Sequence, residues 1–309
     1  MVVHSVLDRV SGVVAFLRNP KVCCEGVESV KKFDAIVIGA GHNGLTNAAY
    51  LAKAGLDVAV LERNSYIGGA TVSRELYEGW TYSNCSYVCS LLRPELVRDL
   101  ELPRHGLQVV PYGGGVTFMK NGDYYGNFYD HERQYREMAR HSKRDANAYE
   151  RYTADVMKQT RLIRPFLLKT PPDPTSLKLR DLKDLMEYGK AFMGLGEAGL
   201  IDALKFWTKS VGDFLDEYFE SDVIKAHLGG TGVIGTALGV YSPGTAYVLL
   251  HHYMGDVDGN VGSWGFARGG MGSVAAALAK SFQGFGGEII CDADVDQIIV
   301  RDGKARGVA

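Results

Sequence analysis

The chain has 309 residues, of which 46% are hydrophobic and 23% are charged. This composition is typical of a globular protein of about two domains and excludes a disordered chain. Its 34 basic and 36 acidic residues leave a net charge of -2, which argues against a nucleic-acid partner. Its five cysteines are too few for a disulfide scaffold. No apolar run approaches the roughly 18 residues of a transmembrane helix, so any membrane contact is expected to be peripheral.

Residues 1–32 are interpreted as an N-terminal extension. Five apolar residues stand at helical spacing and predict an amphipathic helix: Val3, Leu7, Val10, Val14 and Leu17. A terminal helix docked on the protein is the first interpretation, and a weakly basic transit peptide is the alternative.

From Phe33 onward the pattern becomes regular. A short apolar run, Ala35–Ile38, predicts a buried strand. Residues 43–54 then predict a helix that ends at Gly55, and Val58–Leu61 predicts a second buried strand. These three elements form a βαβ unit, which implies parallel strands with a right-handed crossover.

The middle of the chain has a different, mostly helical pattern. Residues 129–168 are polar and helical, and a proline cluster at 165–174 predicts a loop. Another helix is predicted from an apolar stripe made of Val211, Phe214, Leu215, Tyr218 and Phe219. We expect this stripe to be core packing. The glycine-rich stretch 226–272 is expected to be irregular.

The last segment returns to an α/β pattern. It predicts a helix over 273–282 and a strand over 288–291. A hairpin is then expected between residues 295–300 and 305–308, because Asp302-Gly303 is a strong two-residue turn signal.

The turn after the first buried strand carries the motif G-x-G-x-x-G, formed by residues 39–44. Gly39 permits a tight turn, Gly41 lets the backbone approach a pyrophosphate, and Gly44 lets helix and strand pack closely. The helix that begins near Asn43 offers free amides to phosphates. Glu62, at the end of the next strand, is expected to accept hydrogen bonds from an adenosine ribose and to repel a 2′-phosphate. The alternative is a glycine-rich turn with a surface glutamate.

A second glycine signal follows the acid. Arg63 comes directly after Glu62, and Gly68-Gly69 closes the same segment. A glycine pair here lets a second backbone segment approach the pyrophosphate of an extended dinucleotide. It therefore favours FAD over NAD.

The run from Phe33 to Gly69 resembles the N-terminal signature of the phytoene dehydrogenase-like oxidoreductases. These are flavoproteins of the amine oxidase and carotenoid desaturase superfamily. Later runs resemble a narrower branch of that family: Ser90–Pro94, Ser142–Asp145, Tyr247–His252, Trp264–Phe266 and Gly269–Gly272.

The resemblance implies a fold and a domain order. We expect an α/β chain with a discontinuous Rossmann-like FAD-binding domain and an inserted, mainly helical α+β substrate domain. After the extension, residues 33–125 and 263–309 would form the FAD-binding domain, and 126–262 the substrate domain. Val295 matches the position whose backbone contacts adenine in this family, although an ordinary strand residue is the plainer interpretation. Family members continue beyond the position of Ala309, so the chain is expected to be a fragment.

The implied activity is hydride transfer between bound FAD and a C–H or C=C bond of an apolar, isoprenoid or lipid-like substrate. The alternative is a catalytically incomplete fragment, or a non-catalytic protein of this fold that acts through a protein partner. An NAD-dependent dehydrogenase is a weaker alternative. Such an enzyme would have a second βαβ half soon after the first, whereas a polar helical region follows here.

Catalytic residues are harder to predict. His251 and His252 are the acid–base candidates, since histidine moves protons near neutral pH. Four aromatic residues could line a substrate tunnel or simply fill a core: Tyr241, Tyr247, Tyr253 and Trp264. The spacing of Cys85 and Cys89 does not favour a redox dithiol, and no cysteine or histidine set has metal-site spacing. The expected location is the cytoplasm, with the mitochondrial matrix as the alternative.

Overall fold

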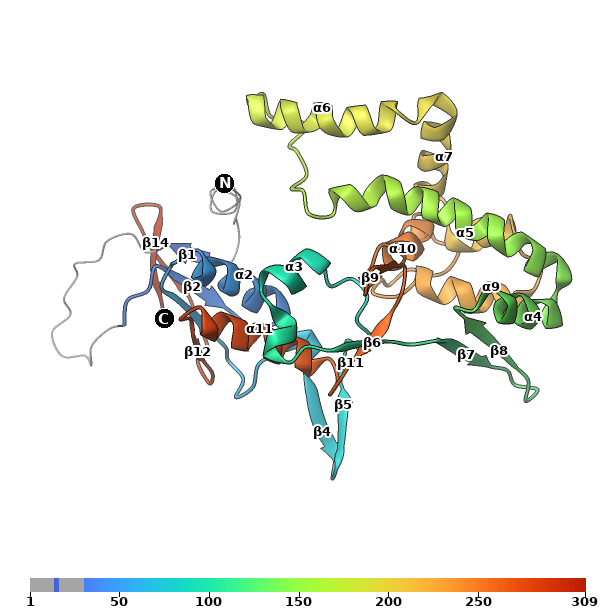
Figure 1. Cartoon of the computed structure of the whole chain (residues 1–309). Coiled ribbons are helices and arrows are strands. Elements are labelled where there is room, and N and C mark those ends of the chain that lie inside the picture. The colour runs from blue at the N-terminus through green and yellow to red at the C-terminus, as the bar shows by residue number, and fades with distance from the viewer. Residues whose placement is uncertain (1–13, 17–30) are drawn as a thin grey trace. The chain divides into compact units, whose positions relative to one another are not determined.

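The computed structural model describes residues 14–16 and 31–309 (Figure 1). The chain forms two compact units. The first joins the described residues up to Pro111 with Trp264–Ala309, and the second is Tyr112–Ser263. This confirms the expected α/β architecture, in which a discontinuous Rossmann-like unit carries a mainly helical insertion. The chain first passes into the second unit at Tyr112, ahead of the 125/126 position at which the family resemblance placed the boundary.

The first unit is built on a four-stranded sheet. Its order is β1 (Val14–Phe16), β2 (Ala35–Ile38), β3 (Val58–Leu61) and β12 (Glu288–Ile290). Strands β2, β3 and β12 are parallel, and helix α2 (His42–Lys53) connects the first two. Gly55 follows this helix with a φ of 88°, which is the left-handed conformation expected of a helix-terminating glycine. The predicted βαβ unit is therefore confirmed.

The predicted N-terminal helix lies mostly outside the described residues. Where the chain is described, the prediction is wrong, because Val14–Phe16 form strand β1 rather than helix. Val14 pairs with Val37 and Phe16 with Ala35 in an antiparallel ladder. Pairing satisfies the backbone groups that β2 would otherwise leave open at the sheet edge.

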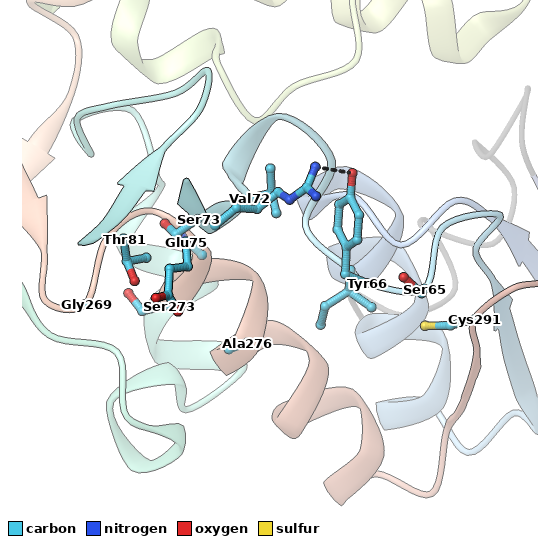
Figure 2. Close-up of a pocket in the computed structure, with 13 residues that line it drawn as sticks. Ser65, Tyr66, Val72, Ser73, Glu75, Thr81, Gly269, Ser273, Ala276 and Cys291 are labelled. Atoms are coloured by element: carbon cyan, nitrogen blue, oxygen red, sulfur yellow. Dashed lines mark hydrogen bonds between the residues drawn. The ribbon is translucent and has the colours of Figure 1, made fainter. Parts of the chain in front are cut away.

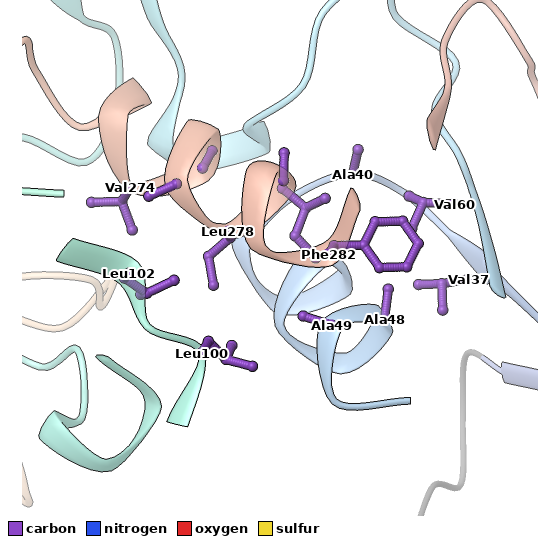
Figure 3. Close-up of a cluster of buried hydrophobic side chains, with 14 of the residues drawn as sticks. Val37, Ala40, Ala48, Ala49, Val60, Leu100, Leu102, Val274, Leu278 and Phe282 are labelled. Carbon is purple, nitrogen blue, oxygen red and sulfur yellow. The ribbon is translucent and has the colours of Figure 1, made fainter. Parts of the chain in front are cut away.

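The core of the first unit lies between α2 and helix α11 (Gly272–Gly284), as Figure 3 shows. Ala48 and Ala49 of α2 are fully buried beside Leu278 and Phe282 of α11. Small alanines let two helices approach closely, and the larger side chains fill the remaining space. The predicted helix over 273–282 is confirmed, with one further residue at its start and two at its end.

Short elements complete this unit. They are β4 (Ser73–Tyr77), β5 (Trp80–Ser83), α3 (Pro94–Asp99), β6 (Val109–Pro111), β11 (Gly265–Ala267), β13 (Ile298–Arg301) and β14 (Lys304–Val308). The hairpin β13–β14 turns through Asp302 and Gly303, which have φ values of 53° and 69°. Two positive φ values are typical of a type I′ turn.

The second unit is mainly helical. Its helices are α4 (His131–His141), α5 (Lys143–Ile163), α6 (Leu179–Met193), α7 (Gly196–Thr208), α8 (Val211–Asp216), α9 (Asp222–Gly229) and α10 (Thr245–His252). Its strands are β7 (Gly114–Phe118), β8 (Tyr124–Phe128), β9 (Asp256–Val257) and β10 (Asn260–Val261). The two larger strands form the hairpin β7–β8.

The predicted apolar stripe at 211–219 is confirmed as core. All five of its side chains are buried, and three of them, Phe214, Tyr218 and Phe219, pack against Tyr152 of α5. The helix predicted from the stripe is shorter than the stripe, because α8 ends at Asp216. The stretch 226–272 is less irregular than predicted, because it includes α10. That helix begins immediately after Gly244, whose φ of 83° sets the turn into it.

Candidate functional site

The turn between β2 and α2 needs glycine at particular positions. Gly39 has a φ of 97°, a conformation that other residues rarely adopt. A Cβ atom at Gly44 would lie 2.1 Å from the carbonyl oxygen of Gly39. Only glycine therefore allows α2 to begin this close to the end of β2, as the G-x-G-x-x-G motif predicts.

The second glycine pair lies directly against this turn. The amide of Gly68 donates to the carbonyl oxygen of Ala40 at 2.9 Å, and Gly41 and Gly68 form a parallel β-bridge. A Cβ at Gly69 would stand 3.1 Å from the Cα of Gly41. The two glycine segments thus meet backbone to backbone, and a side chain at Gly69 would crowd this contact.

The N-terminus of α2 has no side-chain cap. Gly41 precedes the helix, and the first turn contains no acidic residue. Asn43, in that first turn, is exposed. A helix start of this kind presents its amides and the positive end of its dipole to a phosphate group.

Glu62 is the buried acid of the site, with 6% of its surface exposed. Its Oε2 accepts the amide of Ala40 at 2.8 Å, while Oε1 accepts the amide and the side-chain Nδ2 of Asn64 at 2.9 and 2.7 Å. Burial alone would raise the pKa of Glu62. The hydrogen bonds from Asn64 and Ala40, with the charge of Arg63, outweigh burial and lower that pKa.

The segment that follows β12 is fastened to the same place. The amide of Ala293 donates to the carbonyl oxygen of Glu62 at 3.0 Å, and that of Asp292 to Asn64 at 3.2 Å. Strand β13 begins only at Ile298. The prediction of a strand residue at Val295 is therefore wrong, and this residue lies in the loop between β12 and β13.

A pocket of about 670 Å³, widely open to solvent, lies beside the loop that leads to the second glycine pair (Figure 2). It is lined by the loop before Gly68, by strand β4, by the start of α11 and by Cys291. Arg74 closes part of its rim, with its guanidinium 4.8 Å from the ring centroid of Tyr66 and a 3.4 Å hydrogen bond to that hydroxyl.

His251 and His252 lie in the second unit, at the end of α10. Their rings are 5.8 Å apart, and Nδ1 of His252 lies 2.9 Å from the carbonyl oxygen of Val248. Desolvation and the nearby His252 lower the pKa of His251. Both histidines thus belong to the inserted unit, whereas the predicted nucleotide-binding residues gather in the first.

The aromatic tunnel candidates divide between the two units. Tyr241 is largely exposed, and Tyr247 packs edge-on against Trp207. The hydroxyl of Tyr253 lies 3.4 Å from that of the buried Tyr152, so it belongs to the core of the second unit. Trp264 begins the return segment of the first unit.

Cys85 and Cys89 are both free thiols, the first exposed and the second buried. Burial raises the pKa of the Cys89 thiol, which disfavours the reactive thiolate. Among residues 31–309, no cluster of His, Cys, Asp or Glu has the arrangement of a metal site.

Two sets of side-chain hydrogen bonds in the site region were not predicted from the sequence. The Asn64 side chain holds one carboxylate oxygen of Glu62. The hydroxyls of Ser73 and Ser83 accept from the amides of Gly272 and Met271, which caps the start of α11 from a hairpin distant in sequence. Only the first of these has a signal in the sequence, an asparagine two residues after the acid.

Residues 37–96 match the model of the NAD(P)-binding Rossmann-like domain family. Over 295 residues the chain is 37% identical to pyridine nucleotide-disulfide oxidoreductase domain-containing protein 2 of Mus musculus, a match that covers 90% of this chain and 50% of the mouse protein. The family resemblance seen in the sequence is confirmed. The chain spans about half the length of the curated relatives it matches.

Two further similarities extend the comparison. One component of the limonene dehydrogenase of Castellaniella defragrans is 36% identical over 125 residues, covering 40% of this chain and 23% of that component. The crystal structure of Rab GDI from Plasmodium falciparum superposes with a TM-score of 0.51 at 13% identity, covering 88% of this chain and 61% of that one. The second similarity shows a shared fold alone. Of the helices in the described part of the chain, none has the length and apolar character to cross a membrane.

Proposed function

We propose that the chain binds FAD and is part of an FAD-dependent oxidoreductase. The observation that carries this proposal is the buried carboxylate of Glu62, which lies at the end of β3 beside the two glycine segments. A buried, ionised acid at this place matches the hydroxyls of an adenosine ribose. The same negative charge disfavours a dinucleotide with a 2′-phosphate.

Each part of the site has a role toward the dinucleotide. Glu62 would accept from the adenosine ribose, since Oε2 accepts the amide of Ala40 and retains further acceptor capacity. The start of α2, including Asn43, and the paired backbones at Gly41 and Gly68 would take the pyrophosphate. Arg63 adds a positive charge close to Glu62. When bound, the flavin supplies the hydride-accepting ring, and the protein binds, orients and excludes water.

We further propose an apolar, isoprenoid or lipid-like substrate whose C–H bond is oxidised or whose C=C bond is reduced. The resemblance to phytoene dehydrogenase-like enzymes supports this class. So does the similarity to a protein named as part of a limonene dehydrogenase. His251 and His252 remain the acid–base candidates. The alternative is a protein that keeps the dinucleotide site and acts through a protein partner.

The first experiment is to measure the flavin content of the purified chain, with the released cofactor identified by mass. Glu62→Gln keeps the shape of the side chain but removes its charge. It should weaken FAD binding about tenfold or more, because hydrogen bonds to a charged group contribute roughly 1.5–3 kcal/mol.

Glu150→Gln is the matched control, because Glu150 is an exposed acid on α5 of the other unit. It should leave the flavin content unchanged. A folded wild-type chain that neither retains nor takes up FAD would overturn the proposal. Bound FAD without turnover of any isoprenoid or lipid would instead favour the non-catalytic alternative.

A further inference from the structure

Helix α6 has 15 residues, and none of them is buried. Three apolar side chains are largely open to solvent: Leu179 is 87% exposed, Met186 60% and Met193 73%. Together with the more shielded Leu182 they recur at helical spacing and share one face. We call these four residues the α6 stripe.

The α6 stripe is not the face by which the helix packs. The ring of Tyr188 stacks on Phe166 at a centroid distance of 4.2 Å, and Phe192 meets Trp207 edge-on at 5.5 Å. These aromatic residues lie on a different side of α6 from the stripe. The helix is therefore held by one face and leaves its aliphatic face open.

The charges of α6 are arranged unevenly around the stripe. At 3.6 residues per turn, Lys183 and Lys190 fall directly beside it. The acids lie farther around the helix, and Glu187 is paired with Lys169 at 2.9 Å. On its other side the stripe is bordered by Gly189. The apolar face is thus bordered by lysines on one side and by an uncharged glycine on the other.

We propose that the α6 stripe rests on the surface of a lipid bilayer with anionic headgroups. An exposed aliphatic face with lysines at its border is typical of helices that lie in the membrane interface. A 15-residue helix is about 22 Å long, too short to cross a hydrocarbon layer of about 30 Å. A second copy of the chain fits less well, because it would bring the same lysines and no acid at the border to pair with them. The inference does not depend on FAD binding.

The test is co-sedimentation of the full chain with vesicles of phosphatidylcholine alone or mixed with phosphatidylglycerol. The double variant Leu179→Glu/Met186→Glu should reduce the bound fraction about tenfold or more. The matched control is Leu76→Glu, since Leu76 is 60% exposed on β4 of the other unit. It should bind like the wild type, and circular dichroism should show equal helix content in all three proteins.

The lysines provide a second readout. Lys183→Gln/Lys190→Gln should weaken binding to the anionic vesicles and leave the residual binding to phosphatidylcholine unchanged. The proposal is overturned if the wild-type chain sediments with neither vesicle, or if the stripe variant binds as well as the control. It is also overturned if the wild-type chain dimerises without lipid and the stripe variant is monomeric, because a second copy then occupies this face.

Discussion

Glu62 is held by three N–H groups before any ligand is considered. Two of them come from Asn64, whose amide and side chain both donate to Oε1. The side chain of Glu62 is therefore fixed in one orientation, with its remaining acceptor capacity on Oε2. A preorganised carboxylate loses little conformational entropy when a ribose hydroxyl binds.

The lowered pKa of Glu62 predicts how cofactor binding depends on pH. The charged form is favoured in the folded chain, so its contribution to stability is complete above the ordinary glutamate pKa of about 4.3. That contribution is lost as the pH falls through the lowered folded value. FAD affinity should therefore stay constant from neutral pH to about pH 4.3 and decline only below it.

Fluorescence titration of the chain with FAD at successive pH values measures this dependence. In Glu62→Gln the decline of FAD affinity at acid pH should be absent, because glutamine does not titrate in this range. A wild-type midpoint near neutral pH would show that another group controls binding.

At the scale of elements, a motif distant from the site acquires a structural role. The run Ser142–Asp145 begins helix α5. Both carboxylate oxygens of Asp145 accept backbone amides, from Glu220 and Ser221, at 2.9 Å each, and the side chain is fully buried. Arg144 and Ser142 contact the carboxylate of Glu220. The motif thus ties the start of α5 to the turn before α9.

Asp145→Asn should destabilise the second unit by about 2 kcal/mol, because one buried amide would then face an NH₂ group instead of an acceptor. Urea unfolding followed by circular dichroism measures the change. Asp222→Asn is the matched control, since the Asp222 side chain is 98% exposed and its ion pair with Lys225 contributes little. Equal unfolding midpoints for the two variants would contradict this role.

The elements that could be predicted from the sequence are those with local signals. The β2–α2–β3 unit follows from an apolar run, a glycine motif and a helix-ending glycine, and the β13–β14 turn follows from Asp302-Gly303. The hairpin β4–β5 has no comparable local signal, since its strands are mostly exposed. Its Ser73 hydroxyl accepts an amide at the start of α11, a long-range bond that no local pattern predicts. Helix α10 escapes prediction because glycines surround it. The loop position of Val295 escapes it as well, because the backbone bonds on either side of this residue go to Glu62, Asn64 and Ala309 and have no local signal.

At the scale of the whole molecule, the first unit is assembled from both ends of the described chain. Strand β12 joins the sheet beside β3, and the backbone after it bonds to Glu62 and Asn64. The second unit has a separate core around Tyr152 and Leu249. The predicted cofactor site therefore depends on two stretches that are translated far apart and meet only after folding.

FAD binding should protect both stretches together. A ligand that binds the folded form suppresses local opening by roughly a hundredfold when its free concentration is about 100 times its dissociation constant. Hydrogen exchange measured by mass spectrometry should therefore slow in residues 39–44 and 62–69, and also in 291–295. Glu62→Gln, whose affinity is expected to be about tenfold lower or weaker still, should show slowing of about tenfold or less at the same FAD concentration. Protection confined to the first stretch would mean that the loop after β12 lies outside the cofactor site. The proposed adenine contact at Val295 would then fail while the ribose contact at Glu62 survives.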